Sequence, residues 1–198
     1  MEYEARDDRV IVRMPAGQLS AEALRNLVYM LYAKQYLINR ATGSEALCIQ
    51  SSVISDLQRN PPETLAAFAE WIGDHQKKDH IIGFDFDGQD IAIGFPLTHD
   101  PDSIQAFMAL TVAVVRKAAR MKDRPPAACL EPANERFYMH NWLRQLGLTS
   151  VSHKRTREIF LDRLDGHASF RTAEQADKAR ETVREIRRIG RELAKEER

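Results

Sequence analysis

With 198 residues, of which 43% are hydrophobic and 29% charged, the chain can bury one substantial core or two small ones, which excludes an intrinsically disordered protein. The formal net charge is zero, but residues 1–100 hold 9 Lys and Arg against 15 Asp and Glu, whereas residues 101–198 hold 20 against 14. The two halves therefore either complement each other or leave a cationic surface that attracts a polyanion.

The first half of the chain predicts two hairpins. Residues 3–6 and 9–14 form the strands of the first, around the acidic turn Asp7-Asp8. Residues 81–86 and 90–95 alternate with period two, which predicts a second hairpin with Ile82, Phe84 and Phe86 facing the core. Together the hairpins favour a four-stranded antiparallel sheet.

Helices are predicted between and after these hairpins. Ser20 is a good N-cap for a helix over residues 21–39, and Asn60-Pro61-Pro62-Glu63 indicates the start of another. Asp100-Pro101-Asp102 caps a long helix that reaches about residue 122. Arg124-Pro125-Pro126 breaks it, because proline disfavours helical geometry in the residue before it.

We therefore expect an α+β domain over residues 1–123 and a helical basic region over residues 127–198. In the second region Pro132 marks a helix start and Gly147 a helix end, with Leu148 placed for the apolar contact that accompanies such ends. Ser152 is expected to cap the next helix and Gly166 to end it. The predicted fold class is α+β, with a small antiparallel sheet of two hairpins packed on helices, followed by an all-helical C-terminal region.

The last helix has its own start signal and an apolar seam. Thr172-Ala173-Glu174-Gln175 fits a capping box. Spacings of three and four residues then align a seam of small side chains, for which docking on the rest of the protein is favoured over a homodimer, although a homodimer stays open. The seam consists of Ala176, Ala179, Val183, Ile186, Gly190 and Leu193.

The sequence carries no sign of a membrane or secreted protein. No stretch approaches the roughly 18 consecutive apolar residues that span a bilayer, and residues 1–4 are acidic where a secretory signal is basic and then apolar. Cys48 and Cys129 form no CxxC pair. We expect reduced thiols, a cytoplasmic location and no contact with membranes.

Catalytic and cofactor motifs are sparse. Asp85 and Asp87, with Asp90 nearby, could hold a divalent metal, although acidic turns of this kind are usually just solvated. The six histidines show no HxxxH or HExxH spacing, and the sequence has no GxSxG, Walker A or GxGxxG motif. We expect no cofactor, and the lack of these motifs favours a non-enzymatic protein over an enzyme.

A basic constellation around Gly147 is the better candidate for a binding surface, because Lys and Arg neutralise phosphates. Helix, glycine turn and basic helix together resemble a helix-turn-helix, although the turn from Gly147 to Ser152 is long for that motif. A second basic cluster, Arg116, Lys117, Arg120, Lys122 and Arg124, ends the preceding helix, where cations also suit the helix dipole. The candidate nucleic-acid or partner-binding residues are Trp142, Arg144, Lys154, Arg155, Arg157 and Arg163, with His153 beside them.

Several blocks of the sequence carry a resemblance to a group of known proteins. These are residues 2–12, the helix with Ala23-Leu24-Arg25-Asn26-Leu27, Gly94-Phe95-Pro96 with Asp100-Pro101-Asp102, and residues 142–171. They resemble small "virulence-related" accessory proteins of conjugative transposons and other mobile elements of gut bacteria. The resemblance spans most of the chain and supplies no catalytic residues.

The resemblance implies a non-enzymatic accessory protein that binds a nucleoprotein. Mobile elements carry counter-defence proteins, so the leading hypothesis is an anti-CRISPR protein that inhibits a type II CRISPR nuclease. Its cationic half would compete for guide RNA or target DNA, or its acidic half would mimic nucleic acid. The alternatives are a DNA-binding accessory or regulatory factor and a metal-dependent nuclease built on Asp85 and Asp87.

Overall fold

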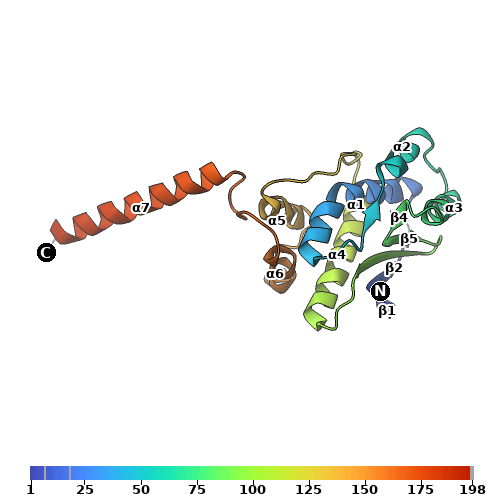
Figure 1. Ribbon diagram of the computed structural model, residues 1–198, viewed down its shortest axis with the longest axis horizontal. Coiled ribbons are helices and arrows are strands. Elements are labelled where there is room, and N and C mark those ends of the chain that lie inside the picture. Colours follow the sequence, from blue (N-terminus) through green and yellow to red (C-terminus); the bar gives the residue numbers. More distant parts are fainter. Residues whose placement is uncertain (7, 18, 197–198) are drawn as a thin grey trace.

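A four-stranded antiparallel sheet forms one layer of the molecule. The computed structural model describes residues 1–196 except 7 and 18, and for residues 173, 176 and 189–196 it describes the backbone alone. The strands run in the order β1-β2-β6-β5, so each predicted hairpin is confirmed and β2 pairs with β6 at the centre (Figure 1). They are β1 (Glu2–Arg6), β2 (Arg9–Pro15), β5 (Phe84–Phe86) and β6 (Asp90–Pro96). The predicted α+β class is therefore correct.

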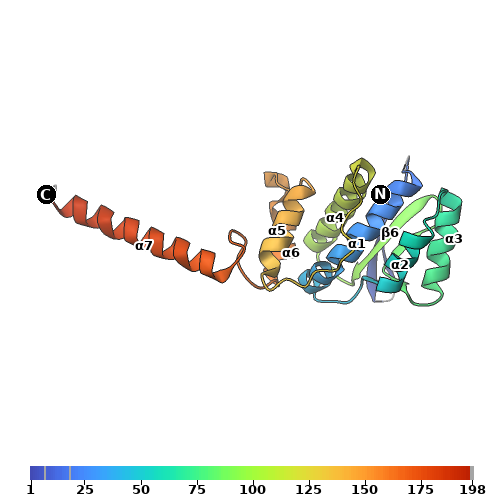
Figure 2. The ribbon, with the colours of Figure 1, turned by 90° about the horizontal axis from the view of Figure 1, so that it is seen from above.

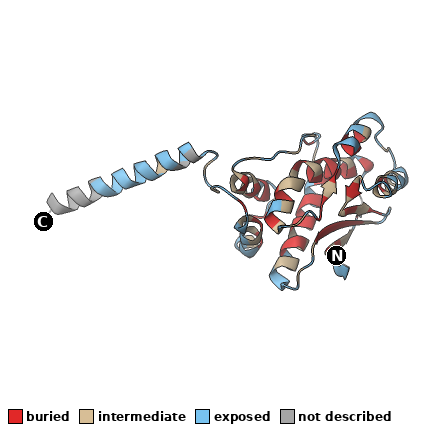
Figure 3. Cartoon of the chain, in the orientation of Figure 1, coloured by how far each residue is buried: buried red, intermediate tan, exposed pale blue. Residues whose placement is uncertain are grey.

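Two long helices, α1 (Ala21–Thr42) and α4 (Pro101–Arg120), lie side by side against one face of this sheet (Figure 2). Both begin as predicted, because Ser20 accepts a hydrogen bond from the Ala23 N–H and Asp100 accepts one from the Ser103 N–H. Helix α1 continues to Thr42, three residues past the predicted end, where Gly43 adopts a left-handed conformation with φ of 69°. The buried residues are concentrated on these two helices and on the strands of the sheet (Figure 3).

Gly83 changes the register of the second hairpin. Its φ of 73° separates β4 (Ile81–Ile82) from β5, and β4 pairs with β3 (Cys48–Ile49) in a separate two-stranded sheet. The expected alternation is interrupted there, so Ile81 is buried and Ile82 only half-buried, whereas Phe84 and Phe86 face the core as predicted. A Cβ atom at Gly83 would collide with the backbone oxygen of Ala46, which is why this position needs glycine.

Helices α2 (Ser51–Arg59) and α3 (Leu65–Gln76) pack beside the small sheet. No prediction was made for α2, whose start has no side-chain cap. The expected start of α3 at the two prolines is wrong, because the helix begins at Leu65, where Thr64 accepts a hydrogen bond from the Ala67 N–H. Its buried residues, Phe68 and Ile72, face the sheet as the spacing predicted.

The C-terminal helices α5 (Glu135–Gln145) and α6 (Lys154–Asp162) share the core of α1 and α4. The Gly147 end of α5 is confirmed, since Gly147 has φ of 83°, the Leu148 N–H donates to Leu143 and the Leu148 side chain is buried. The Ser152 cap is wrong, because a 3₁₀ turn over Val151–His153 leads into α6 and His153 occupies its N-cap position. The predicted end at Gly166 is also wrong, because α6 ends at Asp162, with Arg163 as its C-cap.

Helix α7 (Ala173–Glu196) extends away from the rest of the molecule (Figure 1). Its predicted start is confirmed, since Thr172 accepts a hydrogen bond from the Gln175 N–H. The predicted docking of its seam is wrong where side chains are described, because Val183 is 47% and Ile186 63% exposed. Ala176, Gly190 and Leu193 lie outside the residues whose side chains are described.

Candidate nucleic-acid interface

The cations at the start of α6 are engaged with carboxylates. Arg155 Nε lies 2.8 Å from Asp102 Oδ2, and its Nη1 lies 3.6 Å from Glu158 Oε2. Lys154 Nζ lies 3.8 Å from the other oxygen of Glu158. The side chain of Asp102 belongs to the first turn of α4, 53 residues away, so this pairing was hidden from sequence reasoning. The positive charges of Lys154 and Arg155, two of the predicted site residues, are therefore largely offset by neighbouring carboxylates.

Two further predicted residues, Arg157 and Arg163, hold the backbone. Arg157 Nη1 donates to the carbonyl oxygens of Leu148 at 2.8 Å and Ser150 at 2.9 Å, which fixes the turn after α5. Arg163 Nη1 donates to the Thr42 carbonyl at 3.5 Å, at the C-terminal end of α1, where a cation also suits the helix dipole. Their positions therefore have a structural explanation.

The remaining two predicted residues, Trp142 and Arg144, meet at a hollow along α5. Trp142 is only 4% exposed and anchors α5 in the core, whereas Arg144 is exposed and has no ion-pair partner among the described residues. The hollow, which we call the α5 hollow, has a volume of about 810 Å³. It is lined by Lys34, Phe137, Tyr138, Asn141, Trp142, Arg144, Gln145, Thr149 and Arg171.

Two smaller hollows continue the α5 hollow toward the end of α4. A hollow of about 200 Å³ shares Lys34, Trp142 and Gln145 with it, and a third, of about 510 Å³, shares Lys117 and Gln145 with the second. No Asp or Glu lines any of the three. We call the cations around them the cationic face: Lys34, Arg116, Lys117, Arg120, Arg144 and Arg171.

Helix dipoles explain part of this arrangement. Lys117 and Arg120 lie in the last turn of α4, and Arg144 lies in the last turn of α5. Dipoles do not account for Lys34, in the middle of α1, or for Arg171, which precedes α7. Neither do they account for the lack of carboxylates, since Asp and Glu make up 29 of the 198 residues.

Lys34 is half-buried, whereas the other members of the cationic face are exposed. Burial lowers its pKa, while the nearby thiol of Cys129 acts in the opposite direction. In the part of the chain that is described, no carboxylate pairs with it. An anion bound in the α5 hollow would therefore stabilise the charged form of Lys34, which burial disfavours. Nothing in the sequence singles out Lys34 or Arg171, because each is a lone cation in its own segment.

The relative position of α1 and α5, and so of Lys34 and Arg144, is fixed by Glu135. The carboxylate is 4% exposed and accepts hydrogen bonds from Tyr36 Oη at 2.7 Å and Arg40 Nε at 2.9 Å. It also accepts one from the Asp165 N–H at 3.1 Å. Burial by itself raises the pKa of Glu135, but the Arg40, Tyr36 and Asp165 hydrogen bonds outweigh it, and the pKa lies below its ordinary value.

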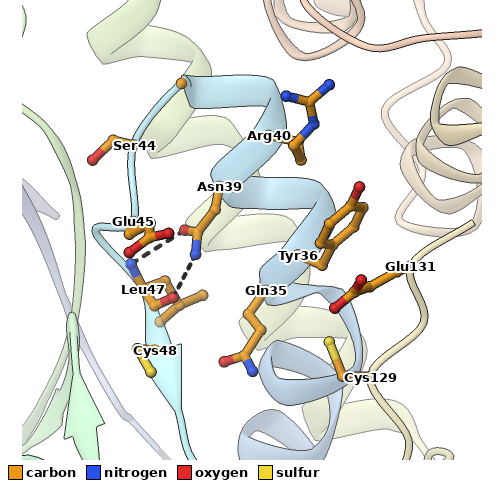
Figure 4. Close-up of a pocket in the computed structure, with 11 residues that line it drawn as sticks. Gln35, Tyr36, Asn39, Arg40, Ser44, Glu45, Leu47, Cys48, Cys129 and Glu131 are labelled. Atoms are coloured by element: carbon orange, nitrogen blue, oxygen red, sulfur yellow. Dashed lines mark hydrogen bonds between the residues drawn. The ribbon is translucent and has the colours of Figure 1, made fainter.

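A separate hollow of about 570 Å³ opens between α1 and β3 (Figure 4). The side-chain amides of Gln35 and Asn39, which line it, are both hydrogen-bonded. Gln35 donates to the carbonyl and accepts from the N–H of Ile49, and Asn39 does the same with Leu47. These bonds hold β3 against α1. Cys48 and Cys129 line the same hollow on either side of Gln35. Its two amides thus serve the fold.

Asp87, one of the two carboxylates proposed for a metal, has a structural role. Asp87 Oδ1 accepts hydrogen bonds from the N–H groups of Asp90 at 2.7 Å and Gln89 at 2.9 Å, and these bonds lower its pKa. Throughout the described ranges, no three His, Cys, Asp or Glu side chains converge in a way that could hold a metal ion.

A histidine contact that sequence reasoning missed links α2 and α3. His75 Nε2 lies 3.2 Å from Asp56 Oδ2, and His75 Nδ1 lies 3.3 Å from His80 Nδ1. The Trp71 indole N–H donates to the same Asp56 oxygen at 2.7 Å. None of the hollows described above includes these residues, and their contacts join α2 to α3.

Comparison with protein-family models, curated proteins and solved structures found no match to this chain. Over the described residues, no helix is both long enough and apolar enough to cross a membrane.

Proposed function

We propose that the protein binds nucleic acid, free or within a nucleoprotein, through the cationic face. The observation that carries this proposal is the grouping of six Lys and Arg side chains around three adjoining hollows that no carboxylate lines. Phosphate is the ligand that such a surface favours, because each Lys or Arg that contacts a phosphate releases a condensed counterion.

The cationic face supports this function better than the cluster at α6. Lys154 and Arg155 share carboxylate partners, whereas the six members of the cationic face have none in the described structure. A helix-turn-helix that reads DNA with α6 is therefore less favoured, because the cations at the start of α6 already have carboxylate partners. A DNA-binding accessory factor that uses the cationic face instead is compatible with the same surface.

The resemblance to mobile-element accessory proteins suggests a more specific role for such binding. A protein that holds guide RNA or target DNA could inhibit a type II CRISPR nuclease by competition, without catalysis. We propose this counter-defence role as the biological setting. It is tested by adding the protein to a guide-loaded nuclease and measuring target cleavage.

Charge reversal tests the binding itself. The variant Arg116→Glu/Arg120→Glu changes the net charge of the cationic face by four, and Lys77→Glu/Lys78→Glu makes the same change near the end of α3. Among the described residues Lys77 forms an ion pair with the exposed Asp74 alone, so the control should fold normally. Fluorescence anisotropy of labelled DNA and RNA at several salt concentrations measures affinity and its salt dependence.

We expect wild-type binding to weaken steeply with salt. For Arg116→Glu/Arg120→Glu the slope of log K against log salt should fall by about 1.4 for single strands and about 1.8 for duplex. The control, and Lys154→Glu/Arg155→Glu, should keep the wild-type slope. Equal losses in all three variants would point to net charge alone and would remove the cationic face from the proposal.

A further inference from the structure

One stripe of α5 faces the α5 hollow with groups suited to more than phosphate. Phe137, Asn141 and Arg144 follow one another at spacings of four and three residues, so they lie on the same side of the helix. Lys34 from α1 and Arg171 from the segment before α7 complete the rim. The hollow therefore combines an aromatic ring, an amide and three cations.

One of the aromatic groups at this hollow, Phe137, is not needed by the core. Phe137 is half-buried and, unlike its neighbour Tyr138, does not pack against the hydrophobic core. Its ring meets that of Tyr138 edge-on, with centroids 5.6 Å apart and planes at 82°. One face of an aromatic pair in this arrangement can take a stacked planar ligand.

The polar groups at the hollow are unused as well. Within the described structure, the side chains of Asn141, Gln145 and Thr149 make no hydrogen bond to protein. This contrasts with Gln35 and Asn39, whose amides are fully engaged with the backbone of β3. Amides that carry both a donor and an acceptor match the edges of nucleobases.

We infer that the α5 hollow receives an unpaired base of a single-stranded nucleic acid whose phosphates lie along the cationic face. Aromatic stacking and amide hydrogen bonds to exposed base edges are the means by which single strands are recognised. A base within a duplex stays stacked and paired, so it could not enter a hollow behind the phosphate-binding cations. The volume of about 810 Å³ lies within the roughly 300–1,000 Å³ of ligand sites, enough for a base and its sugar.

This inference rests on the proposed function and adds a preference that charge alone does not give. The variants Phe137→Ala and Asn141→Ala leave the cationic face intact, so phosphate binding should continue. Tyr3→Ala is the matched control, because Tyr3 is a 51% exposed aromatic residue on β1 that lines none of the three hollows. Far-UV circular dichroism confirms that each variant is folded.

The experiment compares short single-stranded DNA, single-stranded RNA of the same sequence, duplex DNA and an abasic single strand by fluorescence anisotropy. Phe137→Ala should weaken binding of at least one normal single strand by about 5- to 150-fold, the range that loss of one stacked base implies. Duplex affinity should change by less than about twofold, because phosphate contacts dominate there. The abasic strand should bind wild type and Phe137→Ala equally.

Two outcomes would overturn the inference while leaving the proposed function in place. One is a Phe137→Ala variant that loses single-strand and duplex binding to the same extent. The other is an abasic strand that binds wild type as tightly as the normal strand. If wild type bound no nucleic acid at all, the proposed function would fail first. A loss confined to RNA or to DNA would identify which sugar the site accepts.

Discussion

Removing the Glu135 carboxylate should loosen the junction that sets Lys34 against Arg144. The perturbation is Glu135→Ala, with Glu135→Gln as the variant that keeps the shape and removes the charge. In the native chain this buried carboxylate accepts from Tyr36 at 2.7 Å, Arg40 at 2.9 Å and the Asp165 N–H at 3.1 Å.

The magnitude follows from these three donors. A buried charged hydrogen bond contributes roughly 1.5–3 kcal/mol, but the Arg40 side chain is 47% exposed, so solvent screening weakens its bond to Glu135 toward that of a surface pair. The partly buried hydrogen bonds from the Tyr36 hydroxyl and the Asp165 N–H add roughly 1 kcal/mol each, so Glu135→Ala should cost about 3 kcal/mol in all. Glu135→Gln retains an acceptor oxygen and should cost about 1–2 kcal/mol.

Acid should remove the difference in the free energy of unfolding between wild type and Glu135→Gln. Because the folded-state pKa of Glu135 lies below its ordinary value of 4.5, the carboxylate contributes its full stability above that value and loses it as pH falls through the folded pKa. Urea unfolding followed by circular dichroism at about pH 7 and about pH 3 measures this. A Glu135→Ala variant within about 0.5 kcal/mol of wild type, or a Gln difference independent of pH, would refute the reasoning.

Two further substitutions test the fold. Gly83→Ala should lower the free energy of unfolding by at least about 2 kcal/mol, because the left-handed backbone is strained for alanine and its Cβ meets the Ala46 oxygen. Gly17 also has a left-handed backbone, with φ of 62°, but open space where a Cβ would lie. Gly17→Ala should therefore cost only about 1 kcal/mol in the same urea titration. Val183→Lys/Ile186→Lys should shift stability by no more than about 0.5 kcal/mol, since both side chains are exposed on α7. A larger loss for this double variant would show that the seam docks after all.

Local chemistry was sufficient for much of the fold. Ser20, Asp100 and Gly147 act within a turn of their own positions, so their roles as caps and stop could be predicted. The period-two alternation around Phe84 likewise predicts a hairpin, because adjacent strands need only a short turn. Local signals failed at Ser152, where a 3₁₀ turn takes the place of the expected cap.

The candidate site depended on contacts that cross the chain. The sequence showed the basic residues, but Arg155 meets Asp102 only because α6 packs on α4. Arg144 and Lys34 line one hollow because α5 packs beside α1, where Glu135 joins the two helices. Whether a cation is neutralised or free depends on carboxylates that can lie anywhere in the sequence, since Coulomb interactions follow distance in space. The sequence by itself determined the elements and the supply of charge, and the tertiary structure decided which charges remained for a ligand.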